Sequence, residues 1–264
     1  MSEDRLDEAA MLLAEARLNG RTVDRLPEHC RPRDETEAYA VQDRLHKHLT
    51  AEGRDRLLGH KIGCTTPVMQ HYLGIDSPCA GGLFEASVTM SGSRLRHGDF
   101  RHVGVECEIA VRLAKDVRPT PDGHQRDSIG EAVQSCMAAI EIVDDRYLDY
   151  RSLDTSTLIA DDFFNAGAVL GPEVQDWTSL DLADLEGRMS VDGDIVGEGV
   201  GAAILGHPLE ALAWLANREN ARGRSLRAGD LVLLGSLVQT QWVSAGSHVA
   251  ISIDGLGSAS VRFD

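Results

Sequence analysis

The chain has 264 residues, 42% of them hydrophobic, and a formal net charge of -16. This length can bury a substantial core, and the negative charge argues against nucleic acid, which requires clustered positive charge. No run of 18 apolar residues occurs, so no membrane-spanning helix is expected. We expect an anionic substrate to be captured by a local cation, because the overall field of the protein repels it.

Five cysteines are scattered along the chain without a Cys-x-x-Cys pair. This pattern favours free thiols over a disulfide framework or a zinc site. The acidic, polar N-terminal residues do not resemble a secretory signal, so we expect a cytoplasmic protein.

The N-terminal part of the chain predicts two helices. Residues 3–19 have helical apolar spacing and end at Gly20, and Asp34 to Glu37 resemble a capping box for a helix that runs to Gly53. The composition changes near residue 57. We therefore expect a helical section over residues 1–57 and a catalytic domain over residues 58–264.

The middle of the chain predicts a short buried strand over residues 57–65, followed by a loop-rich stretch to residue 101. A capping box at Ser128 to Glu131 predicts a helix through Met137. A strand over residues 168–170 and a hairpin over residues 188–196 follow.

The last third contains a glycine-rich stretch with Gly197, Gly199, Gly201 and Gly206, for which flexibility is expected. A helix begins at Pro208, and short strands complete the chain. His207 is expected to serve the start of that helix structurally. Many short strands with a few helices predict an α+β or a mostly β fold.

Residues 103–113 alternate between apolar and other side chains, as expected of a strand with one core-facing side. Glu106 and Glu108 share the opposite face, with their backbones about 7 Å apart. Two interpretations are open. The pair belongs to a solvated outer face, or it supplies two ligands of a divalent metal that needs a third oxygen ligand.

Two further residues favour the metal. Glu141 stands in the almost wholly apolar strand 138–145, where an unpaired carboxylate would be costly to bury. Lys61 lies between glycines in an apolar segment and is one of only three lysines among the 26 basic residues. A lysine can lose its proton when buried, whereas arginine cannot. A salt-bridged structural role for Glu141 remains the alternative.

Several motifs occur in an order and spacing that resemble the 2-keto-4-pentenoate hydratase and 4-oxalocrotonate decarboxylase branch of the fumarylacetoacetate hydrolase superfamily. The resemblance runs nearly end to end. The matching segments are Gly59-His60-Lys61-Ile62-Gly63, Leu73-Gly74-Ile75-Asp76-Ser77-Pro78, Glu106-Cys107-Glu108, Glu141, Ala160-Asp161-Asp162, Leu205-Gly206-His207-Pro208 and Leu226-Arg227-Ala228-Gly229-Asp230.

The resemblance implies a fumarylacetoacetate-hydrolase-like mixed β-roll or sandwich core behind the helical N-terminal section. It implies that Glu106, Glu108 and Glu141 bind one Mg2+ or Mn2+, with Lys61 beside the metal as an acid, base or carboxylate anchor. The implied substrate is a small anionic 2-hydroxy-2,4-dienoate or its 2-oxo tautomer. Water would add to it to give a 4-hydroxy-2-oxo acid in the catabolism of aromatic compounds. A homo-oligomer is also implied.

The chain departs from the family pattern near the substrate. Hydratases of this branch usually have Pro-Asp-Tyr/Phe-Gly, whereas this chain has Cys79 in the place of the aspartate. Cys79 is either an acid/base thiol or a small space-filling residue. Asp76 and Glu85 are near enough in sequence to replace the missing carboxylate.

The segment that is Ala-Asp-Asn in the family reads Ala160-Asp161-Asp162 here, and Phe164 stands where a small polar residue is common. We expect Asp161 and Asp162 to be catalytic candidates in an altered pocket.

Three other functions remain open beside the hydratase. The missing aspartate favours a decarboxylase of a 4-oxalocrotonate-type 2-oxo-enedioate. A second alternative is a hydrolase that cleaves a C–C bond of an acylpyruvate. A non-enzymatic alternative is an inactive partner subunit.

Overall fold

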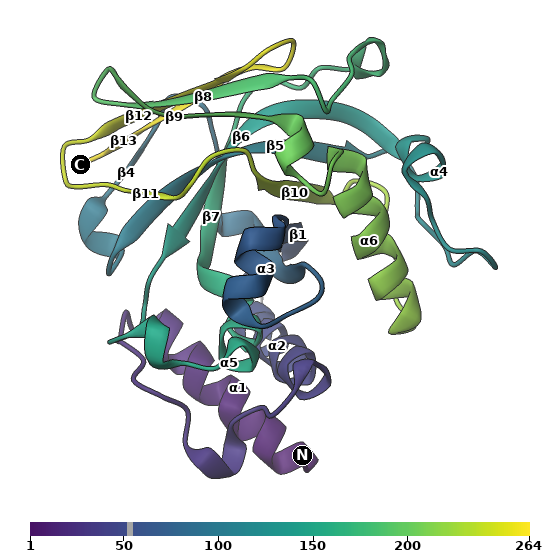
Figure 1. Cartoon of the computed structure of the whole chain (residues 1–264). Helices are drawn as coiled ribbons and strands as arrows, with labels where there is room; N and C mark the ends of the chain where they lie inside the picture. The colour runs from purple at the N-terminus through teal and green to yellow at the C-terminus, as the bar shows by residue number, and fades with distance from the viewer. Residues whose placement is uncertain (52–54) are drawn as a thin grey trace.

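The computed structural model describes residues 1–51 and 55–264. Two β-sheets form the upper part of the molecule, and the N-terminal helices lie below them (Figure 1). The larger sheet has eight strands in the order β2-β1-β10-β5-β6-β7-β3, with β11 paired to β5. Its strands are β1 Leu57–Gly63, β2 Cys79–Phe84, β3 Val88–Met90, β5 Val103–Leu113, β6 Val133–Asp144, β7 Asn165–Leu170, β10 Leu231–Ser236 and β11 Gln241–Trp242.

The smaller sheet has five strands in the order β4-β13-β12-β8-β9 and covers one face of the larger one. Its strands are β4 Ser93–Leu95, β8 Glu186–Val191, β9 Asp194–Val200, β12 His248–Ile253 and β13 Gly257–Phe263. This mixture of helices with two packed sheets confirms the predicted α+β class.

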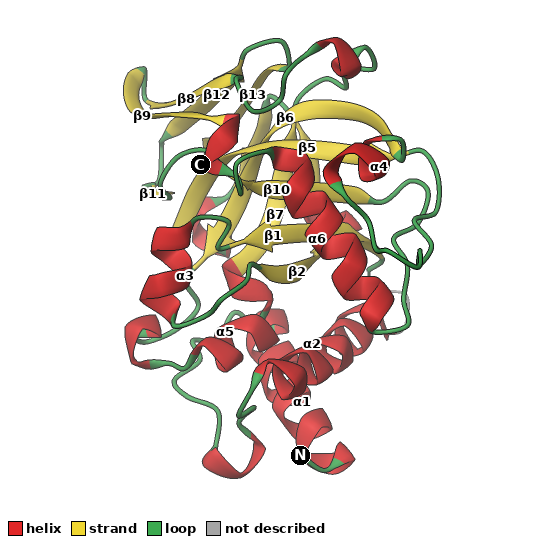
Figure 2. Cartoon of the chain, turned by 45° about the vertical axis from the view of Figure 1, so that its right-hand side comes forward, coloured by secondary structure: helices red, strands yellow, loops and turns green. Residues whose placement is uncertain are grey.

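In the described parts of the chain, six α-helices accompany the sheets: α1 Glu3–Leu18, α2 Glu35–Thr50, α3 Pro67–Leu73, α4 Arg126–Gly130, α5 Thr155–Ala160 and α6 Pro208–Ala221. Helices α1, α2 and α5 lie together below the sheets, while α6 lies beside β10 (Figure 2). The Asp34 side chain caps α2 by accepting from the Glu37 N–H, and His207 caps α6 by accepting from the Leu209 N–H. His207 therefore has the predicted structural role.

Strand β5 connects the core to the candidate site. One of its faces, which includes Val105, Cys107 and Ile109, is fully buried in the main core together with Val249 and Ile251 of β12. The other face carries Glu106, which is partly buried, and Glu108, which is fully buried. Both faces are thus enclosed, and a solvated outer face for the carboxylate pair is wrong: Glu108 is 0% exposed.

Two predictions for the middle of the chain are also wrong. The stretch 67–101 is not mainly loop, because Thr66 caps α3 with Pro67 at its first turn, and β2, β3 and β4 follow. The helix expected through Met137 ends at Gly130, and β6 begins at Val133 because those residues pair with β5 along its whole length. Long-range pairing with β5 outweighs the local helix signal.

The hairpin around Asp192 and Gly193 is confirmed, with both residues at positive φ (54° and 94°), as a two-residue turn requires. The glycine-rich stretch after it is partly strand, because Gly197 and Gly199 belong to β9. A Cβ at Gly199 would lie 2.0 Å from the Leu237 carbonyl oxygen, so close packing rather than flexibility explains this glycine. Within the described residues, every helix is too short or too polar to cross a bilayer.

Candidate metal centre and active site

Strand register brings three carboxylates to one place. In the antiparallel β5–β6 pair, Glu106 lies directly opposite Glu141, so their side chains share a face of the sheet. Glu108 is two residues further along β5 and points to the same side. One oxygen from each residue lies within 4.8 Å of the others. We call Glu106, Glu108 and Glu141 the carboxylate triad.

The triad is buried and its hydrogen bonding is incomplete. Glu108 and Glu141 are both 0% exposed, and Glu106 is partly buried. Glu108 Oε2 accepts from the Gly235 N–H at 3.0 Å, and Glu141 Oε1 accepts from Asn165 Nδ2 at 2.8 Å. Glu108 Oε1 and Glu141 Oε2 have no partner among the described residues. A buried carboxylate oxygen without a partner is costly, so these two atoms call for a cation.

The local electrostatics show the same need. Burial first, and then Glu141, raise the pKa of Glu106 to about 7. Burial and the neighbouring carboxylates Glu141 and Glu106 raise the pKa of Glu108 well above its ordinary value. The protein can relieve this repulsion by retaining protons or by binding a cation.

The donor set fits a hard divalent cation. Mg2+ and Mn2+ prefer carboxylate oxygens, and Mg2+ keeps open coordination positions for water or substrate. The Thr240 hydroxyl donates to Glu106 Oε1, so each triad carboxylate has one oxygen fixed by the protein. These outer contacts orient the carboxylates.

Lys61 is a buried cation beside the triad. From β1, its Nζ donates to the Phe163 carbonyl at 2.9 Å and lies 3.3 Å from Glu141 Oε1. The residue is 3% exposed. Burial alone would lower the pKa of Lys61, but Glu141, Glu106 and Glu108 together raise it, so the amine is charged.

Replacing Lys61 with methionine tests whether this amine donates a proton in the reaction. We expect Lys61→Met to lower kcat by about 10²–10⁴-fold, the usual contribution of a positioned acid or base. The carboxylates stay in place, so calorimetry with Mg2+ should still detect binding to the folded variant. Lys47→Met is the matched control, because Lys47 is an exposed lysine in α2. Unchanged kcat in Lys61→Met would remove Lys61 from the mechanism.

A strained segment positions the groups around Lys61. Asp162, Phe163 and Phe164 are consecutive non-glycine residues with positive φ (54°, 49° and 68°). Such conformations are costly and persist only where surrounding contacts hold them. This segment places the Phe163 carbonyl against Lys61, and Asn165, which immediately follows it, against Glu141.

The strained segment is held in place by contacts to the carboxylates of Asp161 and Asp162, which we call the Asp161–Asp162 network. Arg17 of α1 donates to Asp161 Oδ1 at 2.6 Å and lies 3.0 Å from Asp162 Oδ2. The other members of the network are Arg146 and Tyr147, which donate to Asp161 Oδ2, and His46 and the Gly82 N–H, which contact Asp162 Oδ1. Burial opposes ionisation of Asp162, but His46 and Arg17 hold its pKa below the usual range.

The remaining candidates lie in different settings. Asp76 is exposed in the turn between α3 and β2, and Glu85 pairs with Arg56 at the surface. Cys79 begins β2 opposite Gly63 and is 2% exposed. Contact with Cys64 and burial raise the pKa of the Cys79 thiol, so it remains protonated at neutral pH.

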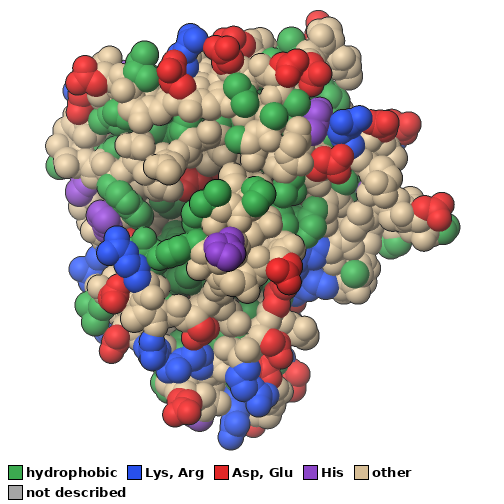
Figure 3. Space-filling view, viewed as in Figure 1, with side chains coloured by type: hydrophobic (Ala, Val, Ile, Leu, Met, Phe, Trp, Pro, Cys, Tyr) green, Lys and Arg blue, Asp and Glu red, His purple; other side chains and the backbone are tan. Residues whose placement is uncertain are grey.

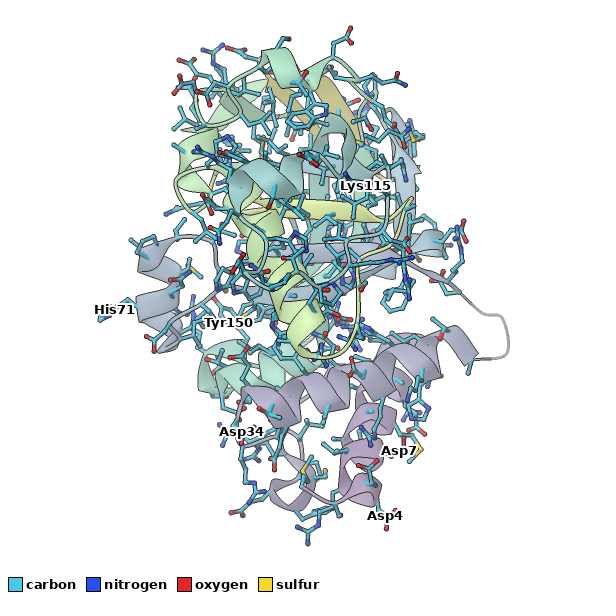
Figure 4. All side chains as sticks on the ribbon, turned by 90° about the vertical axis from the view of Figure 1, so that its right-hand side faces the viewer. Asp4, Asp7, Asp34, His71, Lys115 and Tyr150 are labelled. Carbon is cyan, nitrogen blue, oxygen red and sulfur yellow. The ribbon has the colours of Figure 1, made fainter. Side chains whose placement is uncertain are left out.

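The surface in front of the sheet is hollowed. Figure 3 shows a hollow bordered by hydrophobic side chains, with an acidic side chain visible inside it. In Figure 4, His71 of α3 points away from the body of the molecule, so it is not directed at the triad.

Four supporting groups were not found from the sequence: Arg17, Asn165, Thr240 and the Gly235 N–H. Arg17 lies 144 positions from Asp161, and no local pattern connects them. Gly235 has φ 123°, and a Cβ there would lie 2.6 Å from Thr65 Oγ1. A glycine at position 235 could have suggested close packing, but nothing in the sequence connects its N–H to Glu108.

Comparison with known proteins gives concordant matches. The model of the fumarylacetoacetate (FAA) hydrolase C-terminal family matches residues 77–264. A 2-keto-4-pentenoate hydratase of Burkholderia vietnamiensis is 38% identical over 266 residues, covering 100% of this chain and 99% of that protein. A 2-hydroxyhexa-2,4-dienoate hydratase of Comamonas testosteroni is 32% identical, covering 95% of this chain and 94% of that protein.

Among solved structures, 4-oxalocrotonate decarboxylase from Pseudomonas putida G7, complexed with magnesium and adipate, superposes with a TM-score of 0.93. It is 26% identical, and the match covers 100% of this chain and 99% of that one.

Proposed function

Because the chain belongs to the fumarylacetoacetate hydrolase family, we propose that it is a metal-dependent hydro-lyase that adds water to a 2-hydroxy-2,4-dienoate. The product is a 4-hydroxy-2-oxo acid, and the reaction belongs to the catabolism of aromatic compounds. The observation that carries the proposal is the buried carboxylate triad with Lys61 beside it. Full-length relatives named hydratases, at 32–38% identity, support the reaction type.

Glu106, Glu108 and Glu141 would hold the divalent cation, Mg2+ or Mn2+. The decarboxylase with TM-score 0.93 was solved with magnesium, which supports this choice. A bound cation would supply Lewis-acid stabilisation of negative charge on the substrate oxygens.

The chain's own residues position the proton that the reaction needs. Lys61 Nζ is fixed between the Phe163 carbonyl and Glu141, so its remaining proton can be directed at the substrate. The terminal carbon of the dienol gains a proton while the 2-hydroxyl loses one, which gives the 2-oxo-3-enoate. The hydroxyl of water then bonds to C4 and its proton goes to C3. The Phe163 ring lies 5.7 Å from Lys61 Nζ, so an apolar wall adjoins the donor. Asp161 and Asp162 act indirectly, by holding the Phe163 carbonyl in place.

Cys79 fills space beside Lys61 in this proposal. Its raised pKa makes it a weak proton donor, and its burial leaves little room for a larger side chain. We expect Cys79→Ala to keep kcat within about tenfold of the wild type, below the contribution of a general acid. Steady-state kinetics on the folded variant measures this. A loss of 10² or more would instead make the thiol the acid that replaces the usual aspartate.

A decarboxylase is the second candidate, favoured by Cys79 in place of the aspartate and by the superposition on 4-oxalocrotonate decarboxylase. The hydratase takes precedence because the decarboxylase is only 26% identical, against 38% for the hydratase. Acylpyruvate cleavage and an inactive partner subunit remain outcomes of the same test.

The test incubates purified protein and Mg2+ separately with 2-hydroxy-2,4-pentadienoate, 2-oxo-3-hexenedioate and an acylpyruvate, and identifies products by NMR. We expect a 4-hydroxy-2-oxo acid from the first substrate. Release of CO2 from the second would establish the decarboxylase, and pyruvate from the third the hydrolase. No turnover by folded, metal-loaded protein would support the inactive partner subunit.

We also propose that the enzyme acts in the cytoplasm as a homo-oligomer, with residues 1–57 as a helical section and residues 58–264 as the catalytic domain. The five free cysteines agree with a reducing compartment. Edge strand β9 exposes Ile195 (64%) and Val200 (44%), and an apolar edge strand favours pairing with another chain. Light scattering on the purified protein measures the mass of the assembly.

A further inference from the structure

A second group of metal-ligating side chains lies in the N-terminal helical section. Glu8 belongs to α1, and His29 and Cys30 belong to the 3-10 turn η1, Glu28–Cys30. Each residue offers one ligand atom, and the three atoms lie within 4.8 Å of one another. Neither the carboxylate triad nor the proposed reaction uses these residues.

We propose that Glu8, His29 and Cys30 form a second cation site, selective for Zn2+ or a similar thiophilic divalent ion. The donors are one carboxylate oxygen, one imidazole nitrogen and one sulfur, a combination that zinc accepts and that Mg2+ does not favour. The carboxylate triad offers oxygen alone. The triad should therefore prefer Mg2+ or Mn2+, and the second site should prefer Zn2+.

The three ligand atoms lie near enough to one another, all within 4.8 Å, to be drawn onto a single zinc ion. Ligand atoms about 2.0–2.3 Å from zinc are separated from each other by about 3.3–3.8 Å. His29 Nε2 and Glu8 Oε1 are 2.9 Å apart and hydrogen-bonded, so they must separate by a few tenths of an ångström. Their side chains are 55% and 42% exposed, which leaves them free to do so. Three protein ligands leave the fourth position for water.

Cys30 is the buried ligand of the proposed site. The residue is 0% exposed, and its Sγ makes only a long hydrogen bond, 3.5 Å, to the Pro27 carbonyl. Burial, followed by the Glu8 charge, raises the pKa of the Cys30 thiol, so binding of a cation must displace its proton. The absence of a Cys-x-x-Cys pair argued against a zinc site. That argument covers only sites built from paired cysteines, whereas this site uses one cysteine with a carboxylate and an imidazole.

The site would fasten η1 to α1. Cys30 belongs to a small core with Leu6, Ala9 and Leu26 that is separate from the main core of the sheets. A cation bound across Glu8, His29 and Cys30 would link the two elements that enclose this small core. Its role is therefore structural, and its loss should leave the triad intact.

Cobalt spectroscopy on the full chain tests the proposal. Co2+ is added to Mg2+-saturated protein, and a sulfur-to-cobalt charge-transfer band is sought in the near ultraviolet, because only a thiolate ligand produces it. We expect the band in the wild type and in Glu108→Gln, and its loss in Cys30→Ser. Cys136→Ser, which replaces another buried cysteine, should keep it.

His29→Gln is a second variant that should remain folded, because this side chain is exposed. A loss of binding in it therefore reports on the site and not on unfolding. We expect it to weaken Zn2+ binding by at least ~10-fold and to abolish the rise in Tm that Zn2+ produces in the wild type. Absence of the band in folded wild type, or its persistence in Cys30→Ser, would overturn the site. None of these readouts depends on hydratase activity.

Discussion

Glu108→Gln should abolish Mg2+ binding and, at the same time, raise the Tm of the metal-free protein. Removing one ligand oxygen from the triad should weaken binding by more than ~100-fold, since even outer contacts of a metal site are worth 10–100-fold. The metal-free protein gains stability because Glu108 is fully buried beside Glu106 and Glu141. A neutral amide removes that repulsion, and we expect a gain of about 0.5–2 kcal/mol.

The stability difference between metal-free wild type and Glu108→Gln should depend on pH. The folded pKa of Glu108 is raised above its unfolded value of 4.5, so above that pH the folded state binds more protons than the unfolded state. Metal-free wild type therefore loses stability as pH rises from 4.5. Glu108→Gln removes this contribution, so its advantage should be larger at pH 8 than at pH 5.

Calorimetry with Mg2+ and thermal unfolding in EDTA measure both effects. Glu131→Gln is the matched control, because that side chain is 75% exposed and lies outside the triad. It should bind Mg2+ as the wild type does. If Glu108→Gln binds Mg2+ normally, the triad is not the metal site.

Among the variants proposed for this protein, Arg17→Ala should cause the largest loss in the free energy of unfolding. Arg17 is the residue of α1 that neutralises both Asp161 (1% exposed) and Asp162 (0% exposed). Removing one partner of a buried ion pair leaves an uncompensated charge and typically costs about 3–5 kcal/mol. The same change should lower kcat, because the strained segment that carries the Phe163 carbonyl loses a support.

Urea unfolding and steady-state kinetics check this second expectation. Arg94→Ala is a suitable control, because Arg94 forms an exposed pair with Asp264 and its loss should cost far less. Arg17→Lys should recover part of the stability, since the charge returns without the bidentate geometry. Wild-type stability in Arg17→Ala would show that Arg146 and His46 suffice for the two aspartates.

The main parts of the site were predictable from local patterns. Alternation along β5 placed Glu106 and Glu108 on one face, and the apolar context of Glu141 marked it as exceptional. Burial of a charge in an apolar strand is a strong signal because its cost is high. The hydratase branch of the family followed from motif order, and the comparisons agree with it.

The parts that were missed depend on contacts between distant segments. Three consecutive left-handed residues at Asp162 to Phe164 have no signature in residue type, since bulky side chains disfavour that conformation. They exist because Arg17, His46 and Arg146 hold them, and these residues come from other elements. For the same reason the helix expected through Met137 is strand: pairing with β5 overrides local capping signals.

The most direct measurement is an anomalous difference map from crystals grown with Mn2+. The account predicts one strong peak with an oxygen of Glu106, Glu108 and Glu141 each about 2 Å away, and with Lys61 beside Glu141. No peak between these carboxylates, in crystals of protein that turns over the dienoate, would contradict it.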